Sequence, residues 1–181
     1  DMLFTAVEYR GGPVAIRYPR GNGVGVPLDP GFHTLEIGRG EIVRRGTDVA
    51  ILALGGTVAP SLKAADLLAT DGISAEIVNM RFAKPIDGEL VEDVCRRFSY
   101  VLTVEDHSIT GGFGSAVLET IAARSIQGTR VRVHGVPDAF IEHGTPSELY
   151  AMLKLDAPGI ASVAKNFFRA TPLPSPAATH V

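Results

Sequence analysis

Two arginines in the sequence R-Y-P-R-G, at residues 17–21, have the residue type and the spacing for binding an anion. Arg17 and Arg20 follow an apolar run over residues 14–16, which predicts a short β-strand that ends at the first arginine. A guanidinium binds phosphate or carboxylate through two parallel hydrogen bonds, and nearby glycines let backbone N–H groups approach the same oxygens. The spacing therefore predicts that both arginines converge on one anion, and solvated arginines at a strand end are the alternative.

A second group of candidate residues lies further along the chain. Glu105, Asp106 and His107 follow an apolar run at residues 100–104, at what would be the carboxyl end of a parallel strand, where such sheets usually bind ligands. Gly111 and Gly112 then precede a predicted helix. Their G-G-F-G sequence lacks the G-x-G-x-x-G spacing of a dinucleotide site, so it favours a tight turn with close helix packing. We expect this group to form an interface, with a solvated loop as the alternative.

Four apolar runs predict the sheet that positions these residues. They cannot present a polar face, which is typical of parallel strands covered by helices on both sides. The runs span residues 49–54, 75–80, 100–104 and 131–136. Residues 41–45 and 48–54 flank Gly46 and Thr47, which predicts an antiparallel hairpin whose first strand lies at the sheet edge.

Helical patterns alternate with these strands. Apolar residues recur at helical spacing over residues 90–98 and 117–122. Thr145, Pro146 and Glu148 form a capping box with proline in the first turn, which predicts a helix start. The pattern predicts a doubly wound α/β fold, mostly parallel with one antiparallel edge strand.

The composition limits the classes of function. The 181 residues are 45% hydrophobic and 20% charged, which suits a globular domain, and the net charge of −3 favours neither nucleic acid nor an anionic membrane surface as a partner. No apolar run approaches the roughly 20 residues of a membrane span. The single cysteine, Cys95, excludes an internal disulfide and lies on an apolar helix stripe, so a buried inert thiol is expected. The five histidines show no metal-ligand spacing.

R-Y-P-R-G resembles the end of the pyrimidine-binding domain of the 1-deoxy-D-xylulose-5-phosphate synthase family. The similarity continues in the family's order over about 140 residues, which is far more specific than any single motif. The further motifs are E-I-G-R-G at 36–40, M-R-F-A-K-P-I-D at 80–87, T-V-E-D-H-S at 103–108, G-G-F-G-S at 111–115 and P-D-A-F-I-E-H-G-T-P at 137–146. The resemblance implies a thiamine-diphosphate enzyme of the transketolase group. Such an enzyme condenses pyruvate with glyceraldehyde 3-phosphate, with loss of CO2, and feeds isoprenoid, thiamine and pyridoxal biosynthesis.

The resemblance also implies that the chain is a C-terminal fragment of a much longer homodimeric enzyme. In this family the ligands of thiamine diphosphate and Mg²⁺ belong to upstream segments, so we expect no catalytic residue, no metal ligand and no activity in the fragment alone. Arg17 lies at the position that the transketolase group uses to hold a sugar-phosphate acceptor, so the resemblance implies that it is the primary ligand of the substrate phosphate. Arg20 follows Pro19 and is expected either to support the same phosphate pocket or to brace the linker. In the family the turn that contains Gly111 and Gly112 faces the neighbouring domains, and we expect Glu105, Asp106 and His107 to form an interface near the cofactor. The expected partners are the remaining segments of the same enzyme and its two small substrates.

Three segments are expected from these observations. Residues 1–34 are the end of the pyrimidine-binding domain and a linker, residues 35–170 a transketolase C-terminal-like domain, and residues 171–181 a disordered tail. A bacterial cytoplasmic location is expected, and a plastid location stays open because a transit peptide would lie upstream. The alternatives are another thiamine-diphosphate enzyme, such as a transketolase or a 2-oxoacid dehydrogenase subunit, and a non-catalytic α/β binding module.

Overall fold

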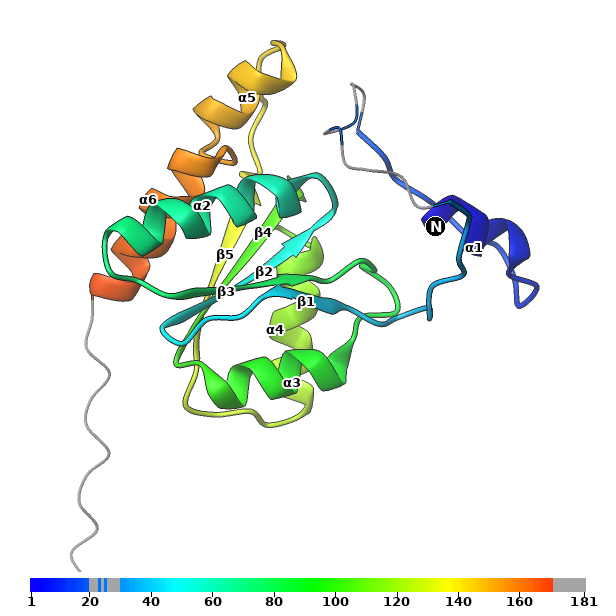
Figure 1. Cartoon of the computed structure of the whole chain (residues 1–181), viewed down its shortest axis with the longest axis horizontal. Helices are drawn as coiled ribbons and strands as arrows, with labels where there is room; N and C mark the ends of the chain where they lie inside the picture. The colour runs from blue at the N-terminus through cyan, green and yellow to red at the C-terminus, as the bar shows by residue number, and fades with distance from the viewer. Residues whose placement is uncertain (20–22, 24, 26–29, 171–181) are drawn as a thin grey trace, which may run out of the picture.

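The computed structural model describes residues 1–19, 23, 25 and 30–170, and its centre is a five-stranded sheet (Figure 1). The strand order is β1-β3-β2-β4-β5, with β1 antiparallel to β3 and all other neighbours parallel. The strands are β1 (Glu41–Arg44), β2 (Val49–Leu54), β3 (Ala75–Asn79), β4 (Tyr100–Ser108) and β5 (Arg130–Val136). The predicted mostly parallel α/β fold with one antiparallel edge strand is confirmed.

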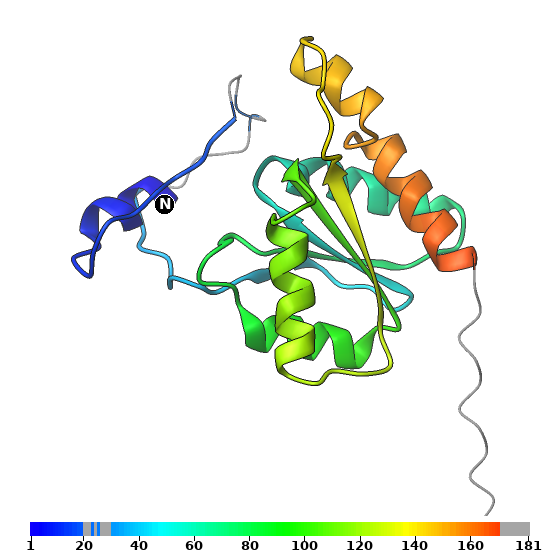
Figure 2. The ribbon, with the colours of Figure 1, turned by 180° about the vertical axis from the view of Figure 1, so that it is seen from behind.

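Helices cover both faces of the sheet (Figures 1 and 2). The helical elements are α1 (Met2–Glu8), η1 (Gly55–Thr57), α2 (Val58–Thr70), α3 (Gly88–Arg97), α4 (Phe113–Ala123), α5 (Pro146–Met152) and α6 (Ala157–Arg169). Successive residues of a strand point to opposite faces. Val49 and Ile51 of β2 therefore pack with α2 and α6, whereas Ala50 and Leu52 pack with α3 and α4. This alternation produces two apolar cores, one on each side of the sheet.

The predicted hairpin between the first two strands is wrong. β1 lies beside β3 and not beside β2, so the chain crosses over the end of β3 between them. Two strand spacings amount to about 9.6 Å, which a few extended residues can bridge. A Cβ at Gly46 would lie 2.2 Å from the backbone of Ala75, so only glycine fits where the chains cross. The turn-like sequence therefore marks a crossing and not a reversal.

The last strand is less buried than its sequence predicts. Only Gly135 of β5 is fully buried, because this strand forms the other edge of the sheet. Arg132 is exposed and lies over the ring of Phe167 in α6, 5.5 Å from its centroid. The expectation of burial on both faces holds for β2 and for most of β3 and β4, but not for this edge.

The N-terminal helix is tied to the segment that precedes the sheet. The backbone N–H of His33 donates to Asp1 Oδ1 at 3.0 Å, and that of Leu35 donates to Thr5 Oγ1 at 2.8 Å. The rings of Phe4 and Phe32 stack 5.8 Å apart. Helix α1 and residues 30–35 therefore form one local unit, which lies beside the sheet in Figure 1. The tail at 171–181, expected to be disordered, lies outside the described residues, and the proposed domain limits stay predictions.

Candidate functional site

Glu105 is a buried carboxylate in the second half of β4, which continues to Ser108 and not only to residue 104 as predicted. It accepts hydrogen bonds from the start of α4. Its side chain is 1% exposed, its Oε2 accepts from the Phe113 N–H at 2.6 Å, and its Oε1 accepts from the Gly114 N–H at 2.8 Å. The first N–H groups of a helix have no partner within the helix, and a negative charge there is favourable. Glu105 therefore fixes the position of α4 from inside the domain.

The glycines after β4 leave the room that Glu105 occupies. A Cβ on Gly112 would lie 2.3 Å from Glu105 Oε2, and one on Gly135 would lie 2.8 Å from Glu105 Cγ. Gly111 has φ of 70°, in the left-handed region that glycine adopts without strain. A Cβ on Gly114 would lie 2.4 Å from Val133 Cγ1. The predicted tight turn with close helix packing is confirmed.

Asp106 joins the end of β4 to helix α5. Its Oδ2 accepts a hydrogen bond from the Tyr150 hydroxyl at 2.9 Å. Burial raises the pKa of Tyr150 well above its usual value, and the hydrogen bond to Asp106 raises it further, so this hydroxyl keeps its proton and donates. A Cβ on Gly56 would lie 2.9 Å from the same hydroxyl oxygen. Tyr150 thus lies where the carboxyl ends of β2 and β4 meet.

Helix α5 has the start that its sequence predicts. Thr145 Oγ1 accepts from the Glu148 N–H, and Glu148 Oε2 accepts from the Thr145 N–H at 2.9 Å, with Pro146 at the first helical turn. Hydrogen bonds from Thr145 lower the pKa of Glu148. The capping box therefore fixes the direction in which α5 presents Tyr150 to Asp106.

Arg17, in the N-terminal segment, is near enough to Tyr150 for its charge to act on that hydroxyl. Its positive charge acts to lower the pKa of Tyr150, against the larger effects of burial and Asp106. Its side chain is exposed and makes no ion pair or hydrogen bond with any residue that the structure describes.

The predicted strand before Arg17 is wrong for this chain, because residues 13–19 form no strand. An extended segment becomes a strand only when its backbone groups pair with a neighbouring strand, and residues 13–19 have none among the described strands. Arg20 lies outside the described residues, so its convergence with Arg17 on one anion stays a prediction.

The predicted residues differ in where their side chains lie. Asp106 and Tyr150 meet near Arg17, whereas His107 and Gly111 are exposed at the end of β4 and in its following turn. Glu105 is enclosed by the domain. Tyr150 is the site residue that the sequence analysis missed, since nothing in its local pattern distinguishes it from any other residue of α5.

The residues that the structure describes do not fit a thiamine-diphosphate site. No group of three or more His, Cys, Asp or Glu side chains in the described ranges could hold a metal ion. Glu105, the buried acid at the carboxyl edge, already accepts two backbone hydrogen bonds.

Cys95 is buried, and burial raises the pKa of its thiol to about 11, which agrees with the inert thiol predicted from the sequence. Within the described part of the chain, no helix combines the length and apolar character required to cross a membrane.

His134 makes the folding stability of this region dependent on pH. Its Nε2 lies 2.8 Å from the Lys154 carbonyl oxygen, in the turn between α5 and α6. Burial lowers the pKa of His134, and the charges of Arg132 and Lys154 lower it further. The unfolded chain therefore binds a proton at this residue more readily than the folded chain does. The contribution of His134 to the free energy of unfolding is therefore complete above the ordinary histidine pKa of about 6.5, and it falls as the pH drops below that value.

We expect His134→Gln to reduce this loss, because an amide can donate to Lys154 without titrating. Urea unfolding of wild type and variant at pH 7.5 and at pH 5.5 measures the difference. Equal losses of unfolding free energy in the two proteins would contradict the assignment.

Residues 38–160 match the protein family described as "Transketolase, C-terminal domain". The chain is 47% identical to 1-deoxy-D-xylulose-5-phosphate synthase 1 of Geobacter sulfurreducens over 180 residues, which cover 99% of this chain and 28% of that protein. The chain therefore spans between a quarter and a third of the length of this curated relative.

Solved structures with the same fold include two transketolases. A split-gene transketolase, described as an inactive β4 tetramer, aligns with a TM-score of 0.72 and 37% identity over 81% of this chain and 47% of that one. A transketolase from Pichia stipitis aligns with a TM-score of 0.53 over 71% of this chain and 18% of that one, and at 21% identity it supports the fold alone. From the match over residues 38–160 and from the fold, the chain belongs to the family of transketolase C-terminal domains.

Proposed function

We propose that this chain is the C-terminal part of a 1-deoxy-D-xylulose-5-phosphate synthase. The complete enzyme condenses pyruvate with glyceraldehyde 3-phosphate and releases CO2, as a homodimer that depends on thiamine diphosphate and Mg²⁺. The observation that carries this proposal is the 47% identity to such a synthase over 99% of the chain. The identity to the split-gene transketolase is lower, at 37%, which makes transketolase the second candidate. The similar synthase comes from a bacterium, which supports a bacterial cytoplasmic location for this protein.

In this proposal Arg17 binds the phosphate group of glyceraldehyde 3-phosphate. The support is its exposed guanidinium, which has no ion-pair partner among the described residues, at the edge where parallel sheets usually bind ligands. Arg20 contributes a second charge to the same phosphate.

The edge formed by Asp106, His107 and Gly111 is proposed to contact the neighbouring domains of the synthase near the cofactor. Asp106 and the exposed His107 provide polar groups for such a contact. Glu105 and Gly112 contribute indirectly, since they hold the turn between β4 and α4 in one conformation. No catalytic residue and no cofactor ligand is assigned to this chain.

The chain alone is expected neither to bind thiamine diphosphate nor to form deoxyxylulose phosphate, because the residues that hold the cofactor are proposed to lie elsewhere in the enzyme. Calorimetric titration of the 181-residue chain with thiamine diphosphate and Mg²⁺ measures this directly. The complete synthase, titrated in parallel, is expected to bind the cofactor saturably. Saturable micromolar binding by the chain alone would show that the cofactor site is misplaced.

A further inference from the structure

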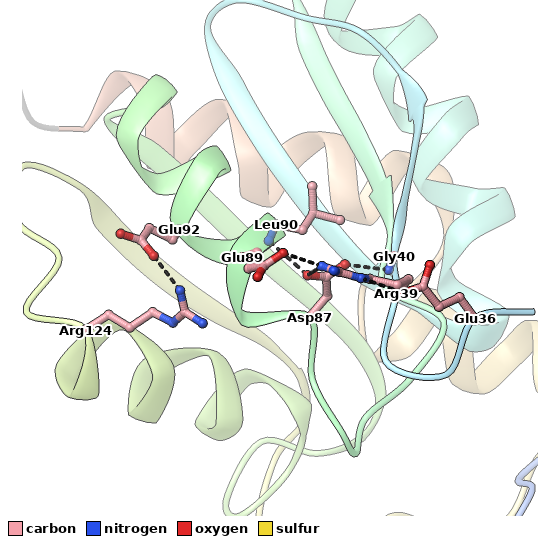
Figure 3. Close-up of polar contacts among 8 residues, drawn as sticks. All are labelled: Glu36, Arg39, Gly40, Asp87, Glu89, Leu90, Glu92 and Arg124. Carbon is pink, nitrogen blue, oxygen red and sulfur yellow. Dashed lines mark hydrogen bonds and ion pairs between the residues drawn. The ribbon is translucent and has the colours of Figure 1, made fainter.

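Asp87 and Arg39 make the contacts that attach residues 36–40, the stretch of chain before β1, to the domain (Figure 3). Asp87 caps α3 by accepting from the Leu90 N–H at 3.0 Å, and its other oxygen accepts from the Gly40 N–H at 2.9 Å. Arg39 Nη1 lies 3.5 Å from Asp87 Oδ1 and donates to Glu89 Oε2 at 2.5 Å. One buried carboxylate, 5% exposed, thus binds the first turn of α3 and the backbone that leads into β1.

The backbone around Arg39 fits closely against the domain. Gly38 has φ of 79°, and a Cβ there would lie 2.9 Å from Pro85 Cγ. A Cβ on Gly40 would lie 2.7 Å from Leu90 Cδ2. Arg39 Nε also donates to Glu36 Oε1 at 3.2 Å, which extends the contact one turn toward the linker. The path of residues 36–40 is therefore fixed by backbone shape, by the hydrogen bond from the Gly40 N–H to Asp87, and by the ion pairs of Arg39 with Glu36, Asp87 and Glu89.

The segment that carries Arg17 is attached on the other side of this point. Helix α1 and residues 30–35 form one unit through Asp1, Thr5 and Phe4, as described above. Between that unit and the Asp87–Arg39 contact there is only a short stretch of chain, which includes Ile37. The direction of residues 36–40 consequently sets the direction in which the N-terminal unit leaves the domain.

We propose that Asp87 and Arg39 are positioning residues for Arg17. They form a latch, defined by Asp87, Arg39 and the Gly40 N–H, that fixes the direction in which the chain leaves the domain toward the unit of α1 and residues 30–35, and so toward Arg17. The proposal rests on the proposed function for its effect on the substrate, but the latch itself can be measured on this chain alone. Neither residue contacts the substrate.

Two variants separate the latch from the helix cap. Asparagine is as good an N-cap as aspartate, so Asp87→Asn keeps one acceptor for Leu90 while it loses the second acceptor and the charge that faces Arg39. Arg39→Ala removes the ion pairs and leaves both backbone hydrogen bonds of Asp87. The matched control is Arg96→Ala, which breaks an exposed ion pair with Glu92 of 2.6 Å on the same helix, away from the linker.

Proteolysis of the full chain by a glutamate-specific protease measures the latch. Cleavage after Glu36 follows the population of opened linker, so both latch variants are expected to be cut there about three- to tenfold faster than wild type. Arg96→Ala is expected to be cut at the wild-type rate. Asp87→Asn leaves the sequence around the cleaved bond unchanged, so faster cleavage in this variant reports opening. Wild-type cleavage rates in both latch variants would overturn the proposal.

Kinetics of the complete synthase test the effect on Arg17. Both latch variants are expected to raise the KM for glyceraldehyde 3-phosphate about two- to fivefold, with the KM for pyruvate unchanged, because only the phosphate contact is displaced. If cleavage rises but neither KM changes, while Arg17→Ala raises the KM for the phosphate substrate, the latch exists but does not position the arginine. If Arg17→Ala itself has no effect, the proposed function fails and the positioning role fails with it, whatever the proteolysis shows.

Discussion

Replacement of Arg17 by alanine in the complete synthase is expected to raise the KM for glyceraldehyde 3-phosphate by about one to two orders of magnitude. A hydrogen bond between charged groups contributes about 1.5–3 kcal/mol, and each 1.36 kcal/mol corresponds to about a tenfold change. The KM for pyruvate is expected to stay near its wild-type value, because pyruvate has no phosphate group. Steady-state kinetics with each substrate varied in turn measure both constants.

The chain offers a matched control for this substitution. Arg10 belongs to the same N-terminal segment, and among the described residues its side chain makes one hydrogen bond, to the Val7 carbonyl oxygen at 3.2 Å. Arg10→Ala removes the same charge and side chain, and it is expected to leave both Michaelis constants unchanged. An equal rise of both constants in Arg17→Ala would indicate a defect in folding or in the interface, and not in phosphate binding.

Replacement of Glu105 by alanine is expected to lower the free energy of unfolding of the chain by about 3 kcal/mol. The substitution leaves the buried N–H groups of Phe113 and Gly114 without their acceptor, and it removes the negative charge at the start of α4. Glu105→Gln keeps one acceptor oxygen and is expected to lose about half as much. Urea unfolding of the two variants and of wild type measures these differences.

His107→Ala provides the comparison at the exposed end of the same strand. Its side chain is exposed, and within the described part of the chain its ring has one hydrogen-bonding contact, with the neighbouring Ser108 carbonyl oxygen at 3.4 Å. The change in unfolding free energy is therefore expected to stay within about 0.5 kcal/mol. If Glu105→Ala were as stable as wild type, the carboxylate would not hold the start of α4 as we describe.

The strands were predictable because their apolar composition indicates that they are buried. β2 is apolar at every position, and such a segment is stable only when both faces are covered. The neighbour of β1 was not predictable in the same way. Gly46 and Thr47 have the composition of a turn, but the same residues also suit a close crossing over Ala75, and only the packed sheet distinguishes the two.

The contacts that build the site join residues far apart in the sequence. Asp106 and Tyr150 are 44 residues apart, and Asp87 and Gly40 are 47 apart. Asp87 could have been identified as a helix cap from its place before α3, but its second hydrogen bond depends on where the linker runs. Glu105 was expected at an interface because it ends a parallel strand, whereas its burial follows from the glycines that leave space for it. The local sequence thus indicated that the candidate site lies at the carboxyl edge of the sheet. Which side chains are exposed at that edge depends on the fold.

Analysis of the products of the complete protein tests the central claim most directly. With pyruvate labelled at its methyl carbon, glyceraldehyde 3-phosphate, thiamine diphosphate and Mg²⁺, we expect the label in 1-deoxy-D-xylulose 5-phosphate, with one CO2 released from the pyruvate carboxylate for each molecule formed. Transfer of a two-carbon unit from xylulose 5-phosphate to ribose 5-phosphate, with no product from pyruvate, would contradict the account and identify the chain as part of a transketolase.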